Sequence, residues 1–322
     1  MVGVGSIGRH HARILSSSPL SNLVAVVDGN EPVGRSVAAA TGATYLPSVD
    51  ELLELGGVEA ATIAVTTEAH ETVASQLLEA GIPVLIEKPI APDVASARRM
   101  ISLAETKGVL LAVGHIERFN PAIRLARSLV REGALGQIIS LTSRRLGPVP
   151  PTRQTTDVVI DLAVHDLDLV AYLLGGTPRI VHAKGGKTAR SRYEDWADIT
   201  LVDDEASCFV QVSWTVPIKI RRIEITGTEG YIEVHNINQT VDFFEAIDWR
   251  DAGDFNEFVE RFGEPRKKRY SVEPEEPLKL ELDSFLSSVL TGDPPEVPGS
   301  VGLAALELAL EARDRVRANG VD

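Results

Sequence analysis

Residues 3–12 read GVGSIGRHHA, and the spacing of their glycines indicates the architecture of the N-terminal half. Gly3, Gly5 and Gly8 follow the pattern GxGxxG. The first glycine of such a pattern permits a tight turn, the second lets the backbone approach a pyrophosphate, and the third allows a helix to pack closely on a strand. The N-terminus of that helix presents N–H groups and a positive dipole end to the phosphates. The stretch therefore predicts a dinucleotide site.

An acidic residue supports this interpretation of the glycines. Asp28 ends the apolar run at residues 23–27 and lies 20 positions after Gly8 (28 − 8). A carboxylate at this position hydrogen-bonds the adenosine ribose and repels a 2′-phosphate, which favours NAD over NADP. Ser6 and Ile7 complete the predicted phosphate loop. An ordinary surface turn with a helix cap is the weaker alternative.

Further apolar runs at 61–65, 84–86 and 109–113 alternate with amphipathic stretches of helix length. This alternation is typical of parallel strands joined by crossover helices. We expect an α/β fold whose N-terminal Rossmann domain, a doubly wound parallel sheet, covers residues 1–117. Only Met1 and Val2 precede Gly3, whereas a first strand needs about five residues. We therefore expect a chain that starts late and lacks part of this strand.

The second half has a different rhythm. Alternating segments begin near residue 180 and continue to residue 234 with few helices between them, and Gly227-Thr228-Glu229-Gly230 links two of them by a turn. Residues 118–322 should form an α+β domain with a large, mostly antiparallel open sheet, and we expect the C-terminal helix to pack back on the first domain. The free face of this sheet is expected to join copies into a homodimer or homotetramer.

Composition excludes several classes of function. The 322 residues carry a net charge of −14, which disfavours binding to nucleic acid, and no apolar run is long enough to span a membrane. Cys208 is the single cysteine, so no internal disulfide framework or cysteine zinc site is expected. The adjacent histidines His10 and His11 point to different helix sides, and we expect no metal. A cytoplasmic protein fits these features.

Two further motifs carry reactive groups. Glu87-Lys88-Pro89 follows the strand at 84–86, at the end where ligands bind open parallel sheets. In the segment 160–174, Asp161 and His165 are i and i+4 neighbours on one side of a predicted helix. The carboxylate can orient the imidazole, which suits a general base that accepts a hydroxyl proton. A surface lysine and a solvated ion pair are the alternatives.

The three motifs together resemble those of the Gfo/Idh/MocA oxidoreductases, and the likeness covers nearly the whole chain. The resemblance implies an N-terminal Rossmann domain, NAD or NADP as cofactor, and Lys88, Asp161 and His165 as active-site residues. In that picture His165 is the acid/base, Lys88 holds the hydroxyl, and Asp161 orients the substrate and the histidine. The three side chains are then expected to converge on the nicotinamide.

The segment 65–70 is also similar to the family's strand end beside the cofactor ribose, although Thr67 stands where the family often has proline. The set expected to bind the cofactor is thus Gly3, Gly5, Ser6, Ile7, Gly8, Asp28, Thr66, Thr67, His70, Glu87 and Lys88. Helix capping is the simpler role for the two threonines.

A polar loop predicts the substrate side. Residues 114–121, GHIERFNP, follow the strand at 109–113, and Glu117, Arg118 and Asn120 suit hydroxyls and phosphates. Arg145 on the next strand is added as a contact for a pyrophosphate. Residues 114–121 and 159–166 resemble those of UDP-N-acetylglucosamine 3-dehydrogenases, which implies NAD-dependent oxidation of a secondary hydroxyl on a sugar or UDP-sugar. An inositol or polyol dehydrogenase and a non-catalytic dinucleotide-binding sensor are the alternatives.

Overall fold

The computed structural model describes residues 1–149, 156–188, 191–203, 206–246 and 266–319. The chain divides into two compact units. The first comprises Met1–Phe119 and Glu276–Glu307, and the second comprises Asn120–Glu275 and Leu308–Asp322. The first unit thus ends its N-terminal segment two residues beyond the expected boundary and also takes in a segment from the C-terminal part of the sequence. Each unit is described by itself.

The first unit is built on parallel strands. Its strands are β1 (Ala25–Val27), β2 (Thr44–Leu46), β3 (Ala61–Ile63), β4 (Val84–Glu87) and β5 (Leu111–Gly114). β1 pairs with β2, and β4 lies between β3 and β5, all in parallel. Val2 joins the two sets because it forms parallel bridges to both Val27 and Ile63. The predicted doubly wound parallel sheet is confirmed, and the residues before Gly3 lie at its centre.

Helices of the first unit follow the strands in turn. They are α1 (Gly8–Ser17), α2 (Glu31–Thr41), α3 (Val49–Leu55), α4 (His70–Glu79), α5 (Val94–Lys107) and α9 (Pro277–Thr291), with short 3₁₀ turns η1 (Thr67–Ala69) and η2 (Ile116–Phe119). Local signals set their ends: the Asp93 side chain accepts the N–H of Ser96 at the start of α5, and Gly108 ends it with a left-handed backbone. α9 packs against α1 and η2, which explains why residues 276–307 belong to this unit.

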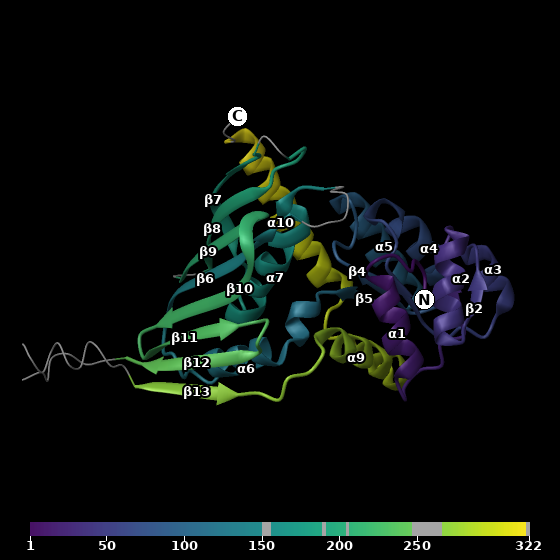
Figure 1. Ribbon diagram of the computed structural model, residues 1–322, viewed down its shortest axis with the longest axis horizontal. Helices are drawn as coiled ribbons and strands as arrows, with labels where there is room; N and C mark the ends of the chain where they lie inside the picture. The colour runs from purple at the N-terminus through teal and green to yellow at the C-terminus, as the bar shows by residue number, and fades with distance from the viewer. Residues whose placement is uncertain (150–155, 189–190, 204–205, 247–265, 320–322) are drawn as a thin grey trace, which may run out of the picture. The chain divides into compact units, whose positions relative to one another are not determined.

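The second unit contains an eight-stranded sheet in the order β13-β12-β11-β10-β6-β9-β8-β7 (Figure 1). The strands are β6 (Ile138–Pro148), β7 (Arg179–Gly186), β8 (Trp196–Asp203), β9 (Ala206–Ser213), β10 (Thr215–Gly227), β11 (Gly230–His235), β12 (Thr240–Glu245) and β13 (Lys267–Ser271). Neighbours are antiparallel except for β6 and β9, which run parallel. The large, mostly antiparallel sheet is confirmed, and the predicted turn at 227–230 joins β10 to β11.

Two helices, α6 (Pro121–Arg131) and α7 (Val164–Leu174), pack on this sheet through contacts with its central strands and with β11 and β12. The sheet face toward α7 is buried, as at Leu141, Val210 and Ile223, whereas alternate residues such as Phe209 face the other way and are exposed. The last helix, α10 (Gly299–Ala318), contributes its first part to the first unit and its remainder to the second. No helix in the described part of the chain has the length and apolar character needed to cross a bilayer.

Candidate active site

The glycine-rich loop has the geometry of a phosphate cradle. Gly3 has φ +80°, and a Cβ on it would lie 2.7 Å from the backbone nitrogen of Val65. A Cβ on Gly8 would lie 1.9 Å from the carbonyl oxygen of Gly3. A Cβ on Gly5 would meet no atom within 4 Å, so contacts inside the protein do not explain this glycine. The first and third glycines thus close the turn, and Gly5 leaves its backbone open to a ligand.

Asp28 is held beside this loop. Its Oδ2 accepts the N–H of Val4 at 2.8 Å, and its Oδ1 accepts the N–H of Asn30 at 2.8 Å. Each carboxylate oxygen has a further lone pair with which to accept a hydroxyl. Together with the exposed Ser6 and the half-exposed Ile7 of the loop, the arrangement fits a dinucleotide with its ribose on the carboxylate.

A buried ion pair fixes the residue before Lys88. The Nε2 atom of His11, on α1, lies 2.9 Å from Oε1 of Glu87 at the end of β4, and Oε2 of Glu87 accepts the backbone N–H of Lys88 at 3.1 Å. Burial acts to raise the pKa of Glu87, but His11 and Lys88 outweigh it and hold that pKa below its usual range. Glu87 therefore connects the helix after the glycine loop to the lysine, and this role was not predicted.

His70 supports the other side of Lys88. It is 1% exposed, and its Nδ1 donates to the carbonyl oxygens of Pro89 at 3.0 Å and Ile90 at 3.2 Å. Burial lowers the pKa of His70, so the ring stays neutral. His70 thus positions the segment after the lysine, and its contact with a cofactor stays a prediction. Thr66 is exposed beyond the end of β3 and makes no side-chain capping bond, so capping does not account for it.

Sequence reasoning missed a buried carboxyl group next to this cluster. Glu281 on α9 is 1% exposed, and within the described residues neither of its carboxyl oxygens has a hydrogen-bond partner. Burial, and then the charge of Glu87, raise its pKa well above the usual value. A signal was present, because Glu281 interrupts the apolar stripe of Leu278, Leu282 and Phe285. The side chain should carry a proton at neutral pH.

Replacing Glu281 with glutamine should therefore stabilise the first unit at alkaline pH. A carboxyl group with a raised pKa in the folded state stabilises fully below its unfolded pKa, and this contribution is lost as the pH rises through the folded pKa. The E281Q variant keeps the shape and removes that loss. We expect its melting temperature to exceed that of the parent chain by several degrees, about 1–2 kcal/mol, at pH 8 and to approach it at pH 5.

The control for this experiment is E307Q. Glu307 is an exposed partner of Arg98, and its replacement should change stability by less than about 0.5 kcal/mol at every pH. Thermal unfolding across pH 5 to 9 measures all three chains. Parallel pH profiles for E281Q and the parent would show that Glu281 holds no buried proton.

In the second unit, the predicted acid/base pair lies at an irregular helix start. The side chain of Asp157 accepts the N–H groups of Val159 and Ile160, both at 3.0 Å, and so caps the helix. The next turn, η3 (Val159–Ala163), is a π-helix and leads directly into α7. Asp161 lies in this widened turn, and His165 follows about one turn later, both half-buried. Such π turns are frequent at functional sites.

Arg145 has a structural partner that the sequence did not reveal. Its Nε lies 2.6 Å from Oδ2 of Asp166 and its Nη2 lies 3.2 Å from Oδ1, with both side chains buried. Ser143 donates a further hydrogen bond of 2.7 Å to Asp166. This network ties α7 to β6 immediately beside His165. It gives Arg145 a structural role, and its predicted contact with a pyrophosphate stays a prediction.

The predicted substrate loop is also largely built into the protein. Asn120 is buried, its Oδ1 accepts the N–H of Ala122 at 3.0 Å, and its Nδ2 donates to the Asn236 carbonyl oxygen at 2.9 Å. Asn120 is thus the N-cap of α6. Arg118 is 9% exposed on η2, whereas Glu117 is half-exposed. Of the three loop residues, Glu117 has the most accessible side chain.

The structure gathers the predicted cofactor residues at one edge of the first unit. The glycine loop, Asp28, Thr66 and Lys88 all follow the carboxyl ends of parallel strands. Lys88 belongs to this unit, whereas Asp161 and His165 belong to the second. The expected convergence of the three side chains stays a prediction.

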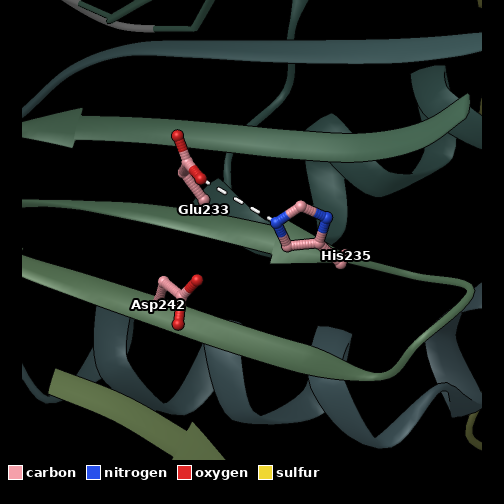
Figure 2. Close-up of side chains that lie close together, drawn as sticks. All are labelled: Glu233, His235 and Asp242. Atoms are coloured by element: carbon pink, nitrogen blue, oxygen red, sulfur yellow. Dashed lines mark ion pairs between the residues drawn. The ribbon is translucent and has the colours of Figure 1, made fainter.

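One cluster in the second unit has the composition of a metal site. Glu233 and His235 on β11 and Asp242 on β12 bring a ligand atom each to within 4.8 Å of one another (Figure 2). Asp242, however, already binds Arg269 at 2.6 and 2.7 Å and Lys267 at 2.9 Å. These hydrogen bonds, led by that from Arg269, hold the pKa of Asp242 far below its usual range. We assign the cluster to an ion-pair ladder across β11, β12 and β13.

Comparison with known proteins identifies the family. The model of the oxidoreductase family with an NAD-binding Rossmann fold, Gfo/Idh/MocA, matches residues 1–115, and that of the Gfo/Idh/MocA C-terminal domain matches residues 123–233. The chain belongs to the Gfo/Idh/MocA oxidoreductase family. The predicted family, fold and enzyme class are confirmed, and the first unit is an NAD-binding Rossmann domain. The sensor alternative is dropped.

Relatives within the family match along the whole chain. UDP-N-acetylglucosamine 3-dehydrogenase from Acidithiobacillus ferrooxidans is 30% identical over 99% of this chain and 96% of its own length. Its solved structure has a TM-score of 0.86 and covers 99% of this chain and 97% of the other. Inositol 2-dehydrogenase from Rhizobium meliloti is 25% identical over 96% of this chain and 93% of its own. The WlbA dehydrogenase from Bordetella pertussis, solved with NADH and UDP-GlcNAcA, shares the fold at a TM-score of 0.83, 23% identity and coverage of 98% and 94%.

Proposed function

We propose that the chain oxidises a secondary hydroxyl of a sugar nucleotide with NAD, and that UDP-N-acetylglucosamine, oxidised at its 3-hydroxyl, is the substrate. The end-to-end similarity to a dehydrogenase of that specificity is the observation that carries the proposal. Lys88, Asp161 and His165 are all present, as the family resemblance requires of a catalytic member.

Each of the three residues has a separate role in the oxidation. His165 accepts the proton of the substrate hydroxyl as general base. Lys88 donates a hydrogen bond to the same hydroxyl oxygen, which stabilises the negative charge that develops as the proton leaves. Asp161 orients the substrate and favours the protonated imidazole. Bound NAD would supply the acceptor for the hydride, which carries the two electrons of the oxidation. With the proton on His165, the alcohol becomes a ketone.

The chain's own residues favour NAD over its phosphorylated form. The Asp28 carboxylate is fixed by Val4 and Asn30 at the end of β1, where a 2′-phosphate would meet its negative charge. Glu31 follows closely, and no arginine stands at residues 29–30. A ribose with both hydroxyls free suits these acceptors.

A substrate panel tests the proposal. The purified chain is incubated with NAD and, separately, UDP-N-acetylglucosamine, other UDP-sugars, myo-inositol and other polyols, and reduced nicotinamide is followed at 340 nm, its usual absorbance band. Reduction with UDP-N-acetylglucosamine and none with the inositols is the expected result. Reduction with inositol alone would establish the second candidate, which the similarity to inositol 2-dehydrogenases favours.

We also propose a cellular location and an oligomeric state for the chain, both of which were expected from the sequence. A cytoplasmic location supplies both NAD and nucleotide sugars. The open face of the eight-stranded sheet, which exposes Phe209 at 46%, is the surface through which copies of this chain would form a homodimer or homotetramer.

A further inference from the structure

A hollow on the helical side of the second unit has three arginines among its six lining residues. It measures about 380 Å³ and is bounded by Arg124, Arg127, Ser128, Arg131 and Glu132 of α6 and by Tyr172 of α7. The arginines are spaced i, i+3 and i+7, so one face of α6 presents all three. Three guanidinium groups at one place are unusual in a chain with a net charge of −14.

One of these arginines is held in place by packing. The guanidinium carbon of Arg127 lies 4.1 Å from the centre of the Tyr172 ring, and Tyr172 is 6% exposed. A cation–π contact with a buried aromatic ring restricts the side chain. The site therefore has a fixed cation at its base rather than three freely moving surface chains.

Two of the three arginines, Arg127 and Arg131, keep their charge available to a ligand. Neither Arg127 nor Arg131 forms an ion pair with any residue that the structure describes. The single carboxylate of the lining, Glu132, accepts a hydrogen bond of 2.7 Å from the Ser128 hydroxyl and joins no described arginine in an ion pair. Arg124 is exposed beside them. Guanidinium groups in this arrangement match the oxygens of a phosphate bidentately.

We propose that Arg124, Arg127, Arg131 and Tyr172 form an anion site that binds a phosphate or diphosphate group. The ligand would be bound by charge-assisted hydrogen bonds from Arg127 and Arg131, and Ser128 would add a hydroxyl donor. The residues of this site belong to the second unit, whereas the glycine loop belongs to the first.

The position of Tyr172 on α7 suggests one source for the bound anion. Tyr172 follows His165 by seven residues, which is two turns and about 10 Å along a helix, on nearly the same side. A sugar at His165 whose diphosphate runs along α7 would bring that diphosphate to Tyr172. This source rests on the proposed function; a free phosphate compound that acts as an effector is the other source, and both share the same chemistry.

Binding of inorganic pyrophosphate tests the site directly. Calorimetry is performed at low salt on the full chain saturated with NAD, so that the glycine loop does not compete for the probe. The R127Q/R131Q variant should bind pyrophosphate at least tenfold more weakly than the parent. The control R179Q/R192Q removes the same charge from the same unit, including an arginine near a tyrosine ring, and should bind like the parent. Equal binding by all three chains, or no binding by the parent, would overturn the proposal.

Kinetics then separate the two sources. If the anion is the substrate's diphosphate, R127Q/R131Q raises KM for UDP-N-acetylglucosamine about tenfold or more, and pyrophosphate inhibits the parent competitively. If it is an effector, KM is unchanged and pyrophosphate binding persists beside the sugar nucleotide. The calorimetric result stands even where no sugar is oxidised, so failure of the proposed function and failure of this site are distinguished.

Discussion

Replacing His165 with alanine should lower turnover of the sugar substrate by about 10²–10⁴-fold, because the hydroxyl proton loses its acceptor. Binding of NAD should be unchanged, since the glycine loop and Asp28 belong to the first unit. Steady-state rates of nicotinamide reduction measure the first effect, and calorimetry of NAD binding measures the second.

His182 provides the matched control for this variant. It is an exposed histidine on β7 of the same unit, and His182→Ala should retain the parent rate. A His165→Ala chain that turns over at the parent rate would remove the general base from the mechanism. A chain that also loses the cofactor would indicate damage to the fold instead of to the chemistry, and thermal unfolding identifies that case.

Replacing Asp166 with alanine should destabilise the second unit by about 3–5 kcal/mol. The change leaves the Arg145 guanidinium buried without its carboxylate and also removes the acceptor of the Ser143 hydroxyl. Since Asp166 is adjacent to His165, activity should fall with stability. Urea unfolding, followed by the fluorescence of Trp196 and Trp214 in this unit, measures the loss.

Two further chains complete this test. Asp198→Asn changes an exposed aspartate that accepts only a hydrogen bond from Gln211 within the described residues, and it should cost less than about 0.5 kcal/mol. The double variant R145M/D166L replaces the ion pair by apolar side chains and should recover most of the lost stability. A cost below about 1 kcal/mol for Asp166→Ala would contradict the structural role assigned to the pair.

Much of the fold was predictable because its signals are local. The spacing of Gly3, Gly5 and Gly8, the acidic residue at the end of the next apolar run, and the period of the later strands each follow from backbone geometry. The turn at 227–230 was predicted for the same reason. The assignment of α9 to the first unit depends on contacts between residues far apart in sequence, which periodicity does not encode.

The contacts that the candidate-site residues make within the protein could not be predicted, and one physical cause explains this. The sequence alone does not show whether a charged or polar residue binds a ligand or another group of the protein. Arg145 was expected at a pyrophosphate and is buried against Asp166, and Asn120 was expected at the substrate and caps α6. His70 likewise binds backbone carbonyls beside Lys88. In contrast, Glu281 could have been noticed as a carboxyl group within an apolar helical stripe.

The most direct test of the central claim follows a labelled hydrogen. UDP-N-acetylglucosamine carrying deuterium at C3 is incubated with the chain and NAD, and the reduced nicotinamide is analysed by mass spectrometry. The predicted result is transfer of the deuterium to the nicotinamide at a slower rate than transfer from the unlabelled sugar. In His165→Ala the same transfer should be slowed by the factor given above. Reduced nicotinamide without deuterium, or no reduction with any nucleotide sugar, would contradict oxidation at the sugar 3-hydroxyl.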